Sequence, residues 1–379
     1  MNTNSQSTLC VHAGKIIDSG TRGMVTPVYP STAYDYIDTP ILAYPRYFNT
    51  PNQKVVVDKL VALEKGEAGL LTSSGMSAIS TVLFGMLRSG DHALFDRNLY
   101  GGTYNAVINE MDKFGISYSF VDGTEQSIRK ARRNNTKLLY FETPSNPLLG
   151  IIDLELMVSL ARELDFSTII DNTFASPINQ NPLTYGVDVV VHSGTKYLGG
   201  HSDIICGAII SSAQEIEKFW NTAINFGGNV NATTASLLER SLKTLSIRVE
   251  KQNQNALEMA MWLENNPKIK QVNYPGLPSH SGHEIAKKQM KGFGGMLSFE
   301  VDLPADVIPQ MLKKLQIAHS SMSLGGVETI VSEPVKTSHS KMPVEERLAI
   351  GISDQLLRLS IGIEDIEDLK TDFERALNS

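Results

Sequence analysis

The sequence contains little cysteine, no long apolar run and no excess of basic residues, and each absence excludes a class of protein. Only Cys10 and Cys206 occur among 379 residues, too few for a fold held together by several disulfides. The longest apolar stretches, such as 188–192, are far shorter than the ~20 residues that span a bilayer. A net charge of −7 does not provide the basic face that a nucleic-acid binder needs. Residues 1–7 are polar and unlike a signal peptide, so we expect a cytoplasmic protein that binds neither membranes nor nucleic acids.

The residues that are present fit an ordinary globular enzyme of more than one domain. Hydrophobic residues make up 41% and charged residues 20%, and 379 residues exceed what a single core usually serves. Residues 1–51 are rich in Thr, Pro, Tyr and Gly without sustained periodicity, so we expect an arm that contacts a neighbouring subunit. We expect a large domain over 52–243 and a smaller C-terminal domain over 244–379.

Short apolar strands alternate with helical patterns through the large domain. This alternation predicts an α/β fold with a mainly parallel, buried sheet, in which ligands lie beyond the carboxyl ends of the strands. The C-terminal part predicts a smaller α+β domain. The strands are expected at 69–72, 92–95, 118–121, 137–141, 167–170, 187–191, 204–210, 294–301, 317–324 and 356–361. The helices are expected at 55–64, 76–87, 104–114, 154–163, 307–315 and, for most of its length, 236–263.

Lys196 and Asp171 are the leading candidates for a chemical role. Each follows a very apolar strand, and a charge at that edge of a sheet has to be solvated, paired or functional. A partly desolvated lysine is a good imine-forming nucleophile. A nearby carboxylate holds a pyridine nitrogen protonated and makes the ring an electron sink. The alternative is an ordinary Lys–Asp ion pair, which these two residues alone do not exclude.

The segment 72–76, Thr-Ser-Ser-Gly-Met, lies between an expected strand and an expected helix. It includes Ser74, Gly75 and Met76; the glycine permits a tight turn, and the free N–H groups of the helix favour a phosphate. Ser193 and Thr195 are candidates to add hydroxyls to the same phosphate. The alternative is a simple helix cap, since the segment lacks the Walker and Rossmann patterns.

Three further side chains follow or interrupt strands. Tyr100 is a candidate to stack on a flat ring or transfer a proton, although a loop tyrosine is the simpler interpretation. Asn146, in a loop stiffened by two prolines, is a candidate to bond a ring substituent, with turn formation as the alternative. Arg358 is a candidate to clamp a substrate carboxylate, with a snorkelling or paired arginine as the alternative. The histidines, including His280 and His283, lack metal-ligand spacing, so no metal is expected.

In their order and positions, these signals resemble one family. The sequence is similar to the Cys/Met-metabolism (transsulfuration) enzymes, which are pyridoxal-phosphate (PLP) enzymes of fold type I, the aspartate-aminotransferase-like fold. The group comprises cystathionine γ-synthase, cystathionine γ- and β-lyases, methionine γ-lyase and homoserine sulfhydrylases. The similarity covers nearly the whole chain and is most specific over 171–177, 192–203, 323–328 and 358–365.

The resemblance implies a role for each candidate residue. It implies PLP held as a Schiff base on Lys196, which later shuttles a proton, and a bond between Asp171 and the pyridinium nitrogen. Tyr100 would stack on the ring and help to deprotonate the substrate, and Asn146 would lie near the ring hydroxyl. The remaining positions would hold the phosphate (Ser74, Gly75, Met76, Ser193 and Thr195) or the substrate carboxylate (Ser323 and Arg358).

The resemblance also implies an assembly. In the family a Tyr-x-Arg motif from a neighbouring subunit completes the phosphate site, and here it reads Tyr44-Pro45-Arg46. A homodimer would then be the smallest active unit, and a homotetramer is expected. The family's Asn-Pro-Thr after this motif is replaced by Asn49-Thr50-Pro51, so the local geometry of the arm differs.

The implied reaction makes or breaks a C–S bond of a sulfur amino acid. We expect a cystathionine-type lyase that releases a thiol, an oxo acid and ammonia. The alternatives are γ-replacement by a cystathionine γ-synthase or O-acylhomoserine sulfhydrylase, methionine γ-lyase and, more distantly, an aminotransferase. Gly102 stands where methionine γ-lyases have cysteine, and Ala43 and Met322 stand where many cystathionine γ-lyases have glutamate. Residues 225–229, Asn-Phe-Gly-Gly-Asn, replace a Ser-Thr-Gly-like segment, so these positions leave the substrate open.

Overall fold

A computed structural model describes residues 4–340 and 342–378, in two compact units. The first unit contains the residues up to 97, together with 102–141 and 154–246. The second contains 98–101, 142–153 and the residues from 247 onward. The second unit is thus assembled from three separate stretches of sequence, two of which interrupt the first unit.

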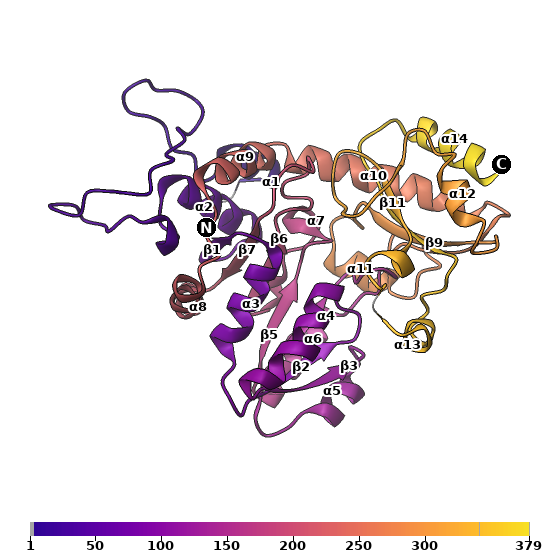
Figure 1. Ribbon diagram of the computed structural model, residues 1–379, viewed down its shortest axis with the longest axis horizontal. Coiled ribbons are helices and arrows are strands. Elements are labelled where there is room, and N and C mark those ends of the chain that lie inside the picture. Colours follow the sequence, from indigo (N-terminus) through magenta and orange to yellow (C-terminus); the bar gives the residue numbers. More distant parts are fainter. Residues whose placement is uncertain (1–3, 341, 379) are drawn as a thin grey trace. The chain divides into compact units, whose positions relative to one another are not determined.

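The first unit is built on a seven-stranded sheet in the order β1-β7-β6-β5-β4-β2-β3 (Figure 1). The pairs β2–β3, β2–β4 and β5–β6 are parallel, whereas β7 is antiparallel to both β1 and β6. The predicted α/β class is confirmed, and the sheet is mixed because β7 runs against its neighbours. The strands are β1 (Ala68–Thr72), β2 (His92–Asp96), β3 (Ser117–Val121), β4 (Thr136–Glu142), β5 (Ser167–Asp171), β6 (Val189–Ser193) and β7 (Gly207–Ser211).

Helices alternate with these strands, and several begin at a residue that caps them. The side chains of Ser212 and Asn231 each accept the N–H three residues ahead, which starts α8 and α9. Their apolar faces are buried and their polar faces exposed. The helices of this part are α1 (Gln6–His12), η1 (Pro45–Tyr47), α2 (Pro51–Glu64), α3 (Gly75–Met86), α4 (Gly101–Glu110), η2 (Met111–Phe114), α5 (Glu125–Ala131), α6 (Leu154–Leu164), α7 (Ser176–Asn179), η3 (Pro182–Tyr185), α8 (Ala213–Phe226) and α9 (Ala232–Leu242).

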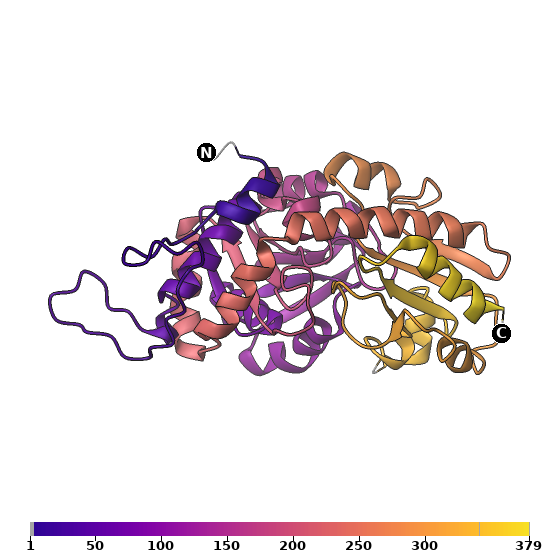
Figure 2. The ribbon, with the colours of Figure 1, turned by 90° about the horizontal axis from the view of Figure 1, so that it is seen from above.

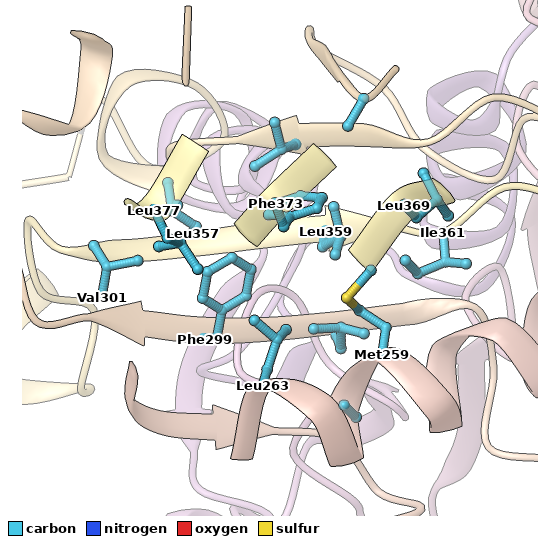
Figure 3. Packing of buried hydrophobic residues seen from close by; sticks show 14 of the residues in the cluster. Met259, Leu263, Phe299, Val301, Leu357, Leu359, Ile361, Leu369, Phe373 and Leu377 are labelled. Carbon is cyan, nitrogen blue, oxygen red and sulfur yellow. The ribbon is translucent and has the colours of Figure 1, made fainter. Parts of the chain in front are cut away.

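The second unit has a five-stranded sheet in the order β10-β11-β12-β9-β8. Its core is one cluster of buried apolar side chains from α10, β9, β12 and α14, with Phe299, Leu359 and Phe373 among them (Figure 3). The elements are α10 (Leu245–Glu264), β8 (Ile269–Asn273), α11 (His283–Gln289), β9 (Met296–Val301), α12 (Ile308–Leu312), β10 (His319–Ser320), β11 (Ile330–Ser332), η4 (Pro334–Lys336), α13 (Val344–Ala349), β12 (Leu356–Ser360) and α14 (Ile366–Leu377). α10 begins at the end of the first unit and continues into the second.

Several expected strands are shorter than the sequence suggested, and two of these border candidate site residues. The strand expected at 204–210 begins only at Gly207. Of the strand expected at 317–324, only His319 and Ser320 pair. Before them, the N–H groups of Ile317 and Ala318 donate to Asp372; after them, Ser323 adopts a left-handed φ of 80° that a strand does not accommodate. Both departures leave irregular backbone next to candidate site residues.

The N-terminal arm combines a docked helix with exposed loops. Within the arm, α1 packs on α2 of the same chain and buries Leu9 and Cys10. The loops that follow extend away from the helices and strands of this unit (Figures 1 and 2). They expose many large apolar side chains: Ile17, Met24, Val25, Val28, Tyr36, Ile37, Ile41 and Leu42. No helix within the described residues is long and apolar enough to cross a membrane.

Candidate cofactor and substrate site

Asp171 lies at the carboxyl end of β5, beside β6. Its register partner is Val191, and its carboxylate accepts a hydrogen bond from the Thr173 N–H at 3.0 Å. Burial raises the pKa of this carboxyl, while hydrogen bonds from Thr173, the charge of His192 and a hydrogen bond from Tyr140 lower it. A carboxylate that is poorly solvated in this way gains most from a cationic N–H partner.

Lys196 lies in the turn that directly follows β6. The turn is closed by hydrogen bonds from the Lys196 N–H to the Ser193 carbonyl (3.2 Å) and from the Gly200 N–H to the Lys196 carbonyl (2.7 Å). Thr195, beside it, exchanges hydrogen bonds with the backbone of Cys206, at 3.3 and 3.2 Å. The backbone that carries the lysine is therefore fixed on both sides.

The first turn of α3 packs against this turn. A Cβ on Gly75 would lie only 2.8 Å from Cβ of Ser193, so a residue without a side chain is needed there. Ser74 is the N-cap, and its hydroxyl accepts the Ser77 N–H at 3.0 Å. The cap expected as the alternative is therefore present, yet the N–H groups of Gly75 and Met76 precede the first intrahelical bonds and can still bind an anion.

These residues fit PLP. β1 and β6 run in the same direction, because each is antiparallel to β7, and β5 is parallel to β6. The turn after β1, the carboxylate of Asp171 and the turn that carries Lys196 therefore lie at one edge of the sheet. A helix N-terminus, a partly buried carboxylate and a lysine match the three groups of the cofactor: phosphate, ring nitrogen and aldehyde.

The second unit brings Arg358, Asn146 and Ser323 together. Arg358 is a buried residue of β12, as predicted for a strand position. Its Nη1 donates to Oδ1 of Asn146 at 3.0 Å, and its Nη2 donates to the carbonyl of Ser323 at 3.2 Å. The strained φ of Ser323 is thus stabilised through its carbonyl, and the guanidinium is held in a fixed plane.

The surroundings of Arg358 are electropositive. Burial, together with the charges of Arg358 and Arg347, lowers the pKa of the His339 imidazole to about 4. Arg347 is itself buried and pairs with Asp354 at 2.8 Å. A positive field around a fixed guanidinium suits an anionic ligand such as the carboxylate of an amino acid.

Tyr100 belongs to the second unit and is held from two directions. Its N–H donates to Oε1 of Glu142 at 2.8 Å, while its ring is exposed. The next residue, Gly101, faces the carbonyl of Ser338, which would be 2.5 Å from a Cβ at this position. The backbone at Tyr100 is therefore positioned by Glu142 on one side and by Ser338 on the other.

Tyr44 and Arg46 lie in the arm. Arg46 Nη1 donates to the Ile224 carbonyl at 2.6 Å, and its guanidinium lies 5.7 and 5.6 Å from the ring centroids of Tyr44 and Tyr47. Both rings are therefore within cation–π distance of the arginine. Within its own chain, Arg46 thus binds α8 and the arm.

Sequence reasoning missed several polar residues that support these candidates. Glu64, His192, Glu142 and His339 are buried, and each contacts or influences a predicted site residue or its neighbour. The available signal was a charged or polar side chain inside an apolar segment, such as the histidine after the three valines of β6. Within the described residues, no group of three or more His, Cys, Asp or Glu side chains is arranged to hold a metal ion.

Comparison with known proteins gives the family. The chain is 40% identical to a cystathionine gamma-lyase of Bacillus subtilis, with 99% of each chain covered. It is 41% identical to a cystathionine beta-lyase of Coxiella burnetii, again with 99% of each covered. The crystal structure of a cystathionine gamma synthase from Xanthomonas oryzae superimposes with a TM-score of 0.95 at 35% identity, covering 99% of this chain and 98% of that one. Residues 7–378 match the family described as Cys/Met metabolism PLP-dependent enzyme, and the chain belongs to that family.

Proposed function

We propose that the protein is a cystathionine-type lyase that uses PLP to eliminate a thiol from a sulfur amino acid, with an oxo acid and ammonia as further products. The observation that carries the proposal is the position of two groups at the same edge of the sheet. Asp171 lies at the end of β5, and the turn with Lys196 follows the adjacent, parallel strand β6. The names of the two lyase relatives support elimination as the reaction. The γ-synthase likeness makes γ-replacement the second candidate.

In this proposal the first unit supplies the cofactor site and the acid–base chemistry. When bound, PLP supplies an electron sink for the carbanion at Cα. Nζ of Lys196 binds the cofactor and then moves the proton that leaves Cα. The Asp171 carboxylate holds a proton at the ring nitrogen, and Gly75, Met76, Ser193 and Thr195 bind the phosphate.

The second unit is proposed to orient the substrate. The guanidinium of Arg358 binds the substrate carboxylate, and Ser323 supports it. Because Arg358 is already bonded to Asn146 and to the Ser323 carbonyl, it does not have to reorganise when the carboxylate binds. Asn146 contacts the ring substituent, and Tyr100 covers the ring and accepts the proton of the incoming amino group.

We propose a homodimer as the smallest active unit, and a homotetramer as the full assembly, in the cytoplasm. The support is the arm, whose exposed apolar side chains need a covering surface and which carries Tyr44 and Arg46. In the proposed dimer these two residues complete the phosphate site of the neighbouring subunit.

The reaction is tested with two incubations of the purified protein. Cystathionine alone should release an oxo acid and ammonia, and Lys196→Ala should abolish both the release and the long-wavelength absorbance of the bound cofactor. The second incubation supplies an O-acylhomoserine with cysteine. Efficient formation of a replacement product, without oxo-acid release from cystathionine, would overturn the lyase proposal in favour of a γ-synthase.

A further inference from the structure

A buried acid–base pair lies beneath the candidate cofactor site. Glu64, the last residue of α2, is 0% exposed, and His192 of β6 is 1% exposed. Oε1 of Glu64 accepts a hydrogen bond from Nε2 of His192 at 2.6 Å. Nδ1 of His192 has no acceptor among the described residues, so Glu64 alone orients the ring.

The same carboxylate oxygen also fixes the residue next to Asp171. Oε1 of Glu64 accepts from Nδ2 of Asn172 at 2.8 Å. Asn172 in turn exchanges two hydrogen bonds with Gln180, both at 3.0 Å, and its backbone N–H donates to the Val191 carbonyl at 3.0 Å. The chain that leaves β5 is therefore tied to Glu64 immediately after Asp171.

His192 acts on Asp171 through charge and not through contact. It follows Val191, the register partner of Asp171, so its side chain points to the opposite face of the sheet. Electrostatically it favours the ionised form of the Asp171 carboxyl, although burial, the largest effect, raises the pKa of that group. The buried carboxylate of Glu64 is satisfied by the hydrogen bonds from His192 and Asn172.

We propose that Glu64 and His192 are positioning residues for the cofactor's ring nitrogen: the pair keeps Asp171 ionised and, through Asn172, fixes the direction of its carboxylate. This inference rests on the proposed role of Asp171. A neutral Asp171 would not hold a proton on the ring nitrogen, and the ring would be a weaker electron sink. The pair itself touches neither the cofactor nor the substrate.

The test removes the charge and keeps the hydrogen bonds. Glu64→Gln retains an oxygen that can accept from His192 and Asn172. The dissociation constant of the apoenzyme is measured for PLP and for the analogue in which carbon replaces the ring nitrogen. We expect Glu64→Gln to weaken PLP binding about tenfold, the factor that a nearby opposite charge typically contributes, and to leave the analogue within about twofold. Equal weakening of both ligands would reduce the pair to a structural role and overturn the proposal.

The same substitution in Asp171→Asn protein, and a matched control variant, distinguish failure of this proposal from failure of the proposed role of Asp171. In Asp171→Asn protein, Glu64→Gln should have no further effect on PLP affinity, and an additive effect would contradict the proposal. If Asp171→Asn alone leaves PLP affinity unchanged, the proposed role of Asp171 fails as well.

The control is His92→Asn. His92 is a buried histidine of the same sheet, bonded to Thr136 (2.8 Å) and Ser119 (3.0 Å), and its replacement should not discriminate between PLP and the analogue. Thermal unfolding of each apoprotein confirms that it is folded.

Discussion

At the scale of single residues, the buried lysine of α2 has a consequence for stability. Lys59 is fully buried, and its Nζ donates to the Cys10 carbonyl at 2.9 Å. Burial lowers the pKa of Lys59 from 10.5 to about 8, although Glu239 partly opposes this effect. The folded chain therefore releases this proton at a lower pH than the unfolded chain does.

The sign of the pH effect follows because the pKa of Lys59 is lower in the folded chain than in the unfolded chain. Between about pH 8 and pH 10.5 the unfolded state binds more protons, so the contribution of Lys59 to the free energy of unfolding rises with pH, by on the order of 3 kcal/mol in total. Below pH 8 both states are protonated and the contribution is constant. Lys59→Met should remove this rise, which urea unfolding of both proteins at pH 7 and pH 10 would measure. Identical pH responses of the two proteins would contradict the expectation.

Gly101 offers a test of how tightly Tyr100 is held. A Cβ at this position would meet the Ser338 carbonyl, so Gly101→Ala should displace the backbone that carries Tyr100. Because a misplacement of about 1 Å can cost about a hundredfold in rate, we expect kcat on cystathionine to fall by up to that factor. Steady-state kinetics check this, and an unchanged kcat would show that the contact does not position Tyr100.

At the scale of elements, α14 is tied to the chain before β10 through one carboxylate. Asp372 is 1% exposed and accepts the backbone N–H groups of Gln316, Ile317 and Ala318 at 2.8, 2.9 and 3.0 Å, and it also pairs with Arg375. Asp372→Ala should lower the free energy of unfolding by about 3 kcal/mol, since three buried donors lose their acceptor. Chemical denaturation measures the loss. Asp368→Ala, an exposed position on the same helix, is the matched control, and an equal loss there would refute the role of Asp372.

The elements also show which parts of the structure could be read from the sequence. Apolar runs predicted Arg358 within a strand and Asp171 directly after one; β12 contains Arg358, and Asp171 is the last residue of β5. The Glu64–His192 pair was not predicted, since its residues are 128 positions apart and only the folded sheet brings them together. The end of the expected strand 317–324 was wrong because local propensity does not reveal the left-handed φ at Ser323.

At the scale of the whole molecule, the proposed dimer makes a prediction about mixed subunits. If Arg46 serves the neighbouring site, Arg46→Ala and Lys196→Ala proteins should each be nearly inactive. Refolded together in equal amounts, half of the dimers would be mixed and each would have one intact site, restoring about a quarter of the wild-type activity. Cystathionine turnover of the mixture measures this. No recovery in mixed dimers, verified by a tag on one subunit, would mean that Arg46 acts within its own chain.

The discontinuous second unit has a consequence for synthesis. Tyr100 and Asn146 belong to it, although the ribosome makes them well before residues 247–378, which form the rest of that unit. Arg358, the partner of Asn146, follows more than 200 residues later (position 358 against 146). The residues of the first unit are thus complete once residue 246 has been synthesised, whereas those proposed to bind the substrate are complete only after Arg358. A chain released before that point would carry Lys196, the proposed cofactor lysine, without Arg358, the proposed carboxylate clamp.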